Sequence, residues 1–145
     1  MRGSRFRYLS ALLLLFLPIH LKASDIRLIK KLLADQGFTG TMEGNVGLHQ
    51  IGEIQCNASK FQVWYYTWEE SGPPGLAIHA AQRLVFIQKG DRYLGSYAVD
   101  DRPARITINS LSFRYSDKSG NSIRCGRGEL PTTVLLNGEI LSLEK

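Results

Sequence analysis

The sequence predicts a mainly β fold, an antiparallel meander that forms a small barrel or a sandwich, with one N-terminal helix and one disulfide. Three observations lead to this prediction. Helical periodicity is confined to one early segment, alternating apolar residues and turn signals fill the rest, and there are two cysteines. Since no helical segments separate the strands, we expect neighbouring strands to pair antiparallel.

The first residues have the pattern of a secretory signal peptide. Three arginines precede an apolar run over Leu9–Leu17, and Ala23 ends a sequence typical of a cleavage site. The run is about half of the roughly 20 residues that span a bilayer, so we expect no integral membrane anchor. The sequence thus predicts a signal peptide over 1–23, a single β-rich domain over 24–145, and a protein that is periplasmic or secreted.

The charge of the chain belongs mostly to this leader. Four of the 18 basic residues lie within 1–23, whereas all 13 acidic residues follow it, which leaves 14 basic against 13 acidic groups, a formal net charge of +1. A nearly neutral domain gives no basis for a nucleic-acid partner, and we expect none.

The two cysteines, Cys56 and Cys125, are predicted to form a disulfide, because exported proteins meet an oxidising compartment. The competing interpretation is a metal site. Only His49 and His79 remain after cleavage, and neither lies at ligand spacing from a cysteine. We therefore expect no metal and no cofactor.

The predicted helix is Asp25–Gln36. Its apolar residues, such as Ile29 and Leu33, recur at helical spacing, Asp25 can cap its start, and Gly37 can end it. We expect this helix to cover one face or one open end of the sheet.

About eight short strands should follow the helix. Phe61–Trp68 is the strongest, because it is dense in aromatic and β-branched residues. Leu76–Gln88 is ambiguous, and we favour a strand with a break near its alanines. The other strands are expected at Asn45–Cys56, Tyr93–Val99, around Ile106 and Ile108, from Leu111 to Tyr115, and at Thr132–Leu136 and Glu139–Leu143, which flank the Asn137-Gly138 hairpin turn.

The aromatic strand suggests a ligand or partner surface. Alternation places Trp64, Tyr66 and Trp68 on one face, opposite Phe61, Val63 and Tyr65. One face could line a ligand cavity or a partner surface. The alternative, which we favour, is a central strand buried on both sides.

An excess of arginine marks the second half of the chain. If the hairpin turns about Ser119, Arg114 falls opposite Arg124, and two adjacent like charges favour an anion between them. The alternative is a solvated face with nearby carboxylates. The arginines of this region are Arg83, Arg92, Arg102, Arg105, Arg114, Arg124 and Arg127.

Evidence for catalysis is mostly absent. His49 and His79 have no nucleophile motif near them, and the adjacent acidic pairs Glu69-Glu70 and Asp100-Asp101 point in opposite directions in an extended chain. We therefore expect no catalytic residues.

The helix with the paired Leu32-Leu33 that leads to Cys56, together with the stretch from Leu111 to Asn121, resembles the VirK family. These are small exported proteins of plant-interacting bacteria, including the virulence regulon of crown-gall agrobacteria. The resemblance implies a periplasmic or secreted, virulence-associated protein and supplies no active site.

Three functions follow as hypotheses. The first is an accessory protein that binds an anionic or apolar small molecule from the envelope or the host, through Trp64, Tyr66 and Trp68 or through Arg114 and Arg124. The second is a module that docks on another envelope protein through the same aromatic residues. The third is an enzyme of unknown type.

Overall fold

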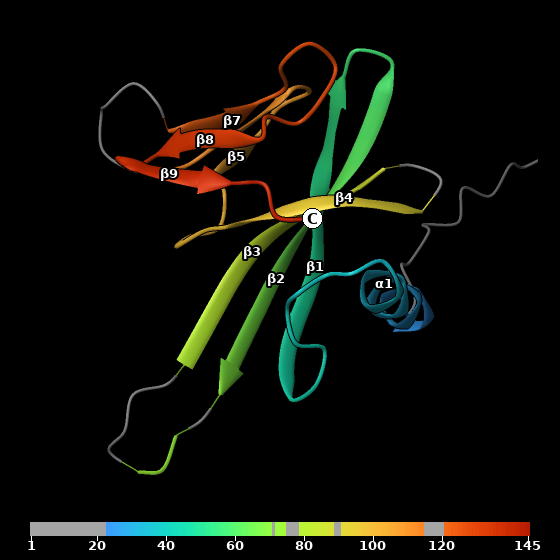
Figure 1. Cartoon of the computed structure of the whole chain (residues 1–145), viewed down its shortest axis with the longest axis vertical. Coiled ribbons are helices and arrows are strands. Elements are labelled where there is room, and N and C mark those ends of the chain that lie inside the picture. Colours follow the sequence, from blue (N-terminus) through green and yellow to red (C-terminus); the bar gives the residue numbers. More distant parts are fainter. Residues whose placement is uncertain (1–22, 71, 75–78, 89–90, 115–120) are drawn as a thin grey trace, which may run out of the picture.

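A computed structural model of the chain describes residues 23–70, 72–74, 79–88, 91–114 and 121–145. These residues form three layers, in which the helix α1 and a group of short strands lie on opposite faces of a four-stranded sheet (Figure 1). The helix spans Ala23–Asp35. The strands are β1 (Asn45–Cys56), β2 (Ser59–Glu70), β3 (His79–Gln88), β4 (Arg92–Ala98), β5 (Arg105–Ile106), β6 (Ser110–Ser112), β7 (Ser122–Arg124), β8 (Thr133–Leu136) and β9 (Glu139–Ser142).

The mainly β, antiparallel prediction with one helix is confirmed. All paired strands run antiparallel, and the described strands form open sheets in the orders β1-β2-β3-β4, β5-β6-β7 and β8-β9. None of these sheets closes on itself, so of the two predicted alternatives the barrel is wrong. The arrangement is a layered one, as in a sandwich, with the helix as an additional layer.

The four-stranded sheet is buried on both faces. Side chains of β2 show the division, because Phe61 and Val63 pack against the short strands while Trp64 and Tyr66 pack against α1. The helix contributes the fully buried Leu33, and Phe38 follows it beneath the same face. The expectation that the helix covers one face of the sheet is confirmed.

The helix begins two residues before its predicted start and ends one residue before its predicted end. Asp25 therefore lies within the first turn rather than capping it. Gly37 has φ +88°, the left-handed conformation that commonly ends a helix at a glycine. The Phe38 N–H then bonds to the Leu33 carbonyl oxygen at 2.9 Å, which turns the chain back toward the sheet.

The predicted disulfide joins the two sides of the molecule. Cys56 ends β1 and Cys125 follows β7, and the two residues are bonded with their Cα atoms 5.4 Å apart. Cys56 is 1% exposed and belongs to the core between the central sheet and the short strands. The crosslink thus fixes the three-stranded sheet to the end of β1.

The C-terminal residues extend the central sheet beyond β4. A bulge in β4 leaves Leu94 without a partner on β3, since Phe86 pairs with Gly95 and Ile87 with Tyr93. Next to the bulge, Ser96 and Glu144 exchange two backbone hydrogen bonds of 2.8 and 2.9 Å.

Several strand predictions need correction. The break expected near the alanines is wrong for Ala80 and Ala81, which pair with β2 inside β3, while residues 75–78 lie outside the described residues. Ile108 is not in a strand but in the β5–β6 turn, where it is 72% exposed. The Asn137-Gly138 turn is confirmed, with φ values of 51° and 84° between β8 and β9.

Candidate functional site

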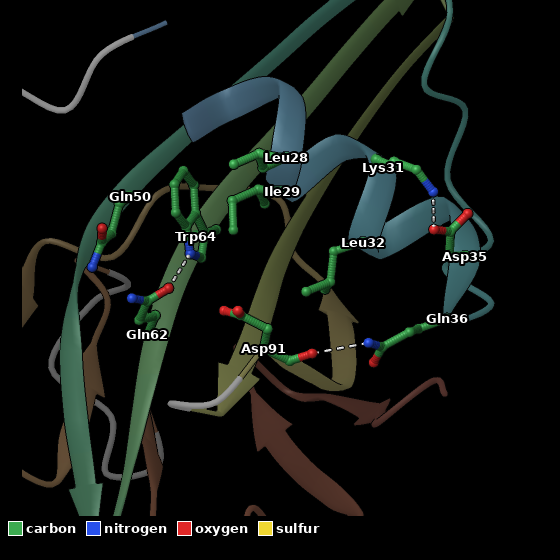
Figure 2. A pocket seen from close by; sticks show the side chains of 10 residues that line it. All are labelled: Leu28, Ile29, Lys31, Leu32, Asp35, Gln36, Gln50, Gln62, Trp64 and Asp91. Atoms are coloured by element: carbon green, nitrogen blue, oxygen red, sulfur yellow. Dashed lines mark hydrogen bonds and ion pairs between the residues drawn. The ribbon is translucent and has the colours of Figure 1, made fainter. Parts of the chain in front are cut away.

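The candidate site is a cleft of about 580 Å³ between α1 and the central sheet. Figure 2 shows that its walls come from the helix on one side and from β1 and β2 on the other, with Asp91, the residue before β4, at one end. Such a volume lies within the range of small-molecule sites. The lining residues are Leu28, Ile29, Lys31, Leu32, Asp35, Gln36, Gln50, Gln62, Trp64 and Asp91.

The apolar part of the cleft comes from helical spacing. Leu28 and Leu32 are four residues apart, so they lie above one another on the same face of α1, with Ile29 beside them. The next residue, Leu33, turns fully into the core, which leaves Leu28 66% exposed at the mouth of the cleft. Trp64 of β2 lies opposite these residues (Figure 2).

Glutamine amides provide the polar part. Gln50 of β1 lies directly across from Trp64, and Gln62 lies two residues before Trp64 on the same face of β2. The Trp64 Nε1–H donates to Gln62 Oε1 at 3.2 Å, which leaves the Gln62 amide nitrogen for other partners. An amide carries both donors and an acceptor, so these side chains match hydroxyl groups, which also donate and accept.

The charges of the cleft sum to one negative. Lys31 forms an ion pair with Asp35 along the helix, so these two charges offset one another at the rim. Asp91, from the β3–β4 turn, points into the cleft (Figure 2) and has no ion-pair partner within the described part of the chain. A carboxylate without a cation disfavours an anionic ligand here.

Gln36 fixes the width of the cleft. Its Nε2 donates to the Asp91 carbonyl oxygen at 2.9 Å, and its Oε1 accepts from the Tyr93 N–H at 2.7 Å. One side chain therefore joins the end of α1 to the turn that begins β4. These two bonds restrain the spacing between the helix end and Asp91 at one end of the cleft.

The structure places the predicted aromatic residues in the core rather than on a free surface. Trp64 and Tyr66 are 2% and 1% exposed, and Trp68 packs half-buried beside them. The Tyr66 hydroxyl donates to the Thr41 carbonyl oxygen at 2.7 Å, and burial raises the pKa of this phenol. Of the three residues only Trp64 lines the cleft.

The structure does not bring the predicted arginine pair together. Arg124 lies opposite Ser110 in the β6–β7 ladder, so Arg114 lies four residues farther along, about 13 Å in an extended strand. The prediction that Arg114 faces Arg124 is therefore wrong. Both side chains are nevertheless exposed and lie on the same side of this sheet.

The other sequence candidates give no second site. His49 is exposed on β1 and has no ion-pair partner among the described residues, and the side chain of His79 lies outside them. No group of three His, Cys, Asp or Glu residues that could hold a metal ion occurs in the part of the chain that the structure describes.

Sequence reasoning missed the polar half of the cleft. Asp91 and Gln36 come together only through packing of the helix on the β3–β4 turn, which no local pattern indicates. Gln62 could have been predicted from the sequence, because alternation places it on the same face of β2 as Trp64. A polar residue at that position indicates that the face is not fully covered.

Comparison with known proteins gives no relative, since no family model, curated protein or solved structure matches this chain. The resemblance to the VirK family stays a prediction. Within the described residues, no helix is long and apolar enough to cross a membrane.

Proposed function

We propose that residues 24–145 form an exported binding protein whose ligand occupies the cleft between α1 and the central sheet. The observation that carries this proposal is the composition of the cleft, where glutamine amides and a carboxylate with no ion-pair partner among the described residues surround an apolar wall. Sugars present the complementary pattern, because hydroxyl groups alternate with apolar C–H faces. The ligand is a short, uncharged oligosaccharide.

Export is part of the same proposal. The leader pattern over 1–23 and the Cys56–Cys125 bond both suit an oxidising compartment, either the periplasm or the exterior. The VirK resemblance favours the same compartment and a role in virulence.

The docking module is the weaker candidate. It would use Trp64, Tyr66 and Trp68 as a contact surface, yet the first two are buried beneath α1. A partner could reach them only if the helix left the sheet, which would expose the whole helix-side core.

The test is binding of the mature chain to an array of neutral oligosaccharides, followed by calorimetric titration with the sugar that binds best. Two matched variants on β1 separate the cleft from the rest of the surface. Gln50→Leu removes a cleft amide, whereas Gln55→Leu changes a half-buried glutamine outside the cleft, whose amide bonds to the Asn57 carbonyl oxygen.

Loss of one hydrogen-bonding amide should weaken binding by about tenfold. We expect this loss for Gln50→Leu and an unchanged affinity for Gln55→Leu, with both variants folded by circular dichroism. If no neutral oligosaccharide binds, or if both variants bind as the parent does, the proposal is wrong.

A further inference from the structure

A second charged surface lies on the opposite side of the molecule from the cleft. The β5-β6-β7 sheet buries one side, where Leu111 and Ile123 are fully enclosed against the central sheet. Side chains alternate along a strand, so the neighbouring residues face outward. The residues of this outer side that are exposed or half-buried are Arg105, Thr107, Ser112, Arg114, Ser122 and Arg124, whereas Ser110 is buried.

The register fixes how the three arginines are arranged. Arg105 pairs with Ser112, and Ser112 pairs with Ser122, so these residues form one row across the sheet. Arg124 belongs to the next row, opposite Ser110. Arg124 and Arg105 are separated by two strand spacings and by two residues along the strands, which places their Cα atoms about 12 Å apart.

Arg114 extends the face at the other end. The Phe113 N–H bonds to the Asn121 carbonyl oxygen at 3.0 Å, which continues the β6–β7 ladder, and Phe113 is buried on the core side. Arg114 therefore falls on the outer side, where it is exposed. It is a diagonal neighbour of Arg105, about 7 to 8 Å away.

No described residue of this face carries a negative charge. The ion pairs within the described part of the chain are Lys31–Asp35 and Arg83–Glu144, so the three arginines have no carboxylate partner there. Like charges at this spacing repel one another, and an anion that bridges them removes the repulsion. The guanidinium group binds a carboxylate through two parallel hydrogen bonds.

The other side chains of the face narrow the class of anion. Those that the structure describes are hydroxyl-bearing, from Thr107, Ser112 and Ser122, and none of them is aromatic or aliphatic. The Thr107 hydroxyl lies 2.6 Å from the buried Ser110 hydroxyl. Single-stranded nucleic acid is bound on stacked aromatic residues, and membrane-surface binding usually adds buried apolar side chains. A surface of arginine and hydroxyl side chains instead suits a chain that carries both hydroxyl and carboxylate groups.

We infer that the outer face of β5-β6-β7 binds an acidic polysaccharide, with Arg105, Arg114 and Arg124 gripping carboxylates on successive sugars. This site is separate from the cleft and does not depend on the function proposed for it. The cleft selects against anions through Asp91, whereas this face selects for them.

The experiment measures the affinity of the mature chain for polygalacturonate in a low-salt buffer, with uncharged dextran as the negative probe. One triple variant carries Arg105→Gln, Arg114→Gln and Arg124→Gln. The control triple carries Arg27→Gln, Arg92→Gln and Arg102→Gln, which removes the same charge from exposed arginines elsewhere. Circular dichroism verifies that both variants are folded.

We expect the face variant to lose about tenfold or more in affinity, because its three arginines bind the same polymer together. The control should lose about twofold or less, because single exposed charges contribute little. The salt dependence of binding should also become shallower in the face variant alone. Equal losses in the two triples would mean that net charge alone attracts the polymer and would overturn the proposal. So would equal or tighter binding to duplex DNA or to anionic lipid vesicles than to polygalacturonate.

Discussion

Gly95 is a position where one added methyl group should detach the C-terminal residues from the central sheet. It lies at the β4 bulge with φ +146°, a conformation that side-chain-bearing residues rarely adopt. A Cβ atom there would lie 2.7 Å from the Glu144 carbonyl oxygen and 2.8 Å from Leu143 Cδ1. Backbone atoms cannot remain so close to a carbon, so the segment from Leu143 onward must move.

The cost follows from what that movement breaks. The two backbone hydrogen bonds between Ser96 and Glu144 contribute about 1 kcal/mol each. The strained backbone conformation adds about 1 to 3 kcal/mol. Gly95→Ala should therefore lower the free energy of unfolding by about 4 kcal/mol, a large part of the stability of a small domain.

Urea unfolding followed by circular dichroism measures this loss on the mature chain. Gly126→Ala is the matched control, because a Cβ at Gly126 meets no atom within 4 Å and its φ is not positive. The control should change stability by less than about 1 kcal/mol. A loss below about 1 kcal/mol for Gly95→Ala, or an equal loss in the control, would refute the reasoning.

Three further predictions concern the disulfide, the buried Tyr97 phenol and the Gln36 side chain that joins α1 to the start of β4. Replacing Cys56 and Cys125 by alanine should lower the free energy of unfolding by about 4 kcal/mol, because the bond closes a loop with a sequence separation of 69. Burial raises the pKa of Tyr97 well above 10.0. The contribution of this phenol to the free energy of unfolding should therefore be fully present below pH 10 and be lost as the pH rises further. Gln36→Met should remove two hydrogen bonds and accelerate amide hydrogen exchange in α1.

Each of these has its own control and contradiction. Reducing the parent protein should reproduce the loss of the double alanine variant in urea, and an unchanged midpoint would contradict the role of the bond. For Tyr97, ultraviolet titration should show that Tyr97→Phe removes the phenol that ionises last, and ionisation near pH 10 without unfolding would contradict its burial. For Gln36, amide hydrogen exchange in β2 serves as the internal control, and unaltered exchange in α1 would show that the two Gln36 hydrogen bonds do not stabilise the helix.

Local patterns predicted the helix and most of the strands, but they did not predict every strand register. The helix and the β8–β9 hairpin were predictable because their signals lie within a few neighbouring residues, such as Asn137-Gly138. The β6–β7 register was not, because the observed pairing differs from the predicted one by four residues. An even shift keeps Leu111 and Ile123 on the buried face in both registers, so hydrophobic alternation could not distinguish them.

The candidate site depends on contacts between distant segments, which explains why only part of it was predicted. The aromatic pattern of β2 indicates Trp64 as a site residue, yet Trp64 and Tyr66 are both buried, and of the two only Trp64 lines the cleft. Gln50 meets Trp64 only through the β1–β2 register, which shifts between Gln50 and Gly52. Asp91 meets the helix only through Gln36, across 55 residues of sequence.

Sugar binding in the cleft is tested most directly by a magnetic resonance titration of isotope-labelled mature chain with a mixture of short neutral oligosaccharides. The chain has two tryptophans and therefore two indole N–H signals, which a Trp68→Phe variant assigns. Trp64 lines the cleft and Trp68 lies outside it. If the cleft binds sugar, we expect a saturable shift of the Trp64 signal with that of Trp68 unchanged. An unmoved Trp64 signal, or a shift confined to Trp68, would contradict the proposal that the cleft binds sugar.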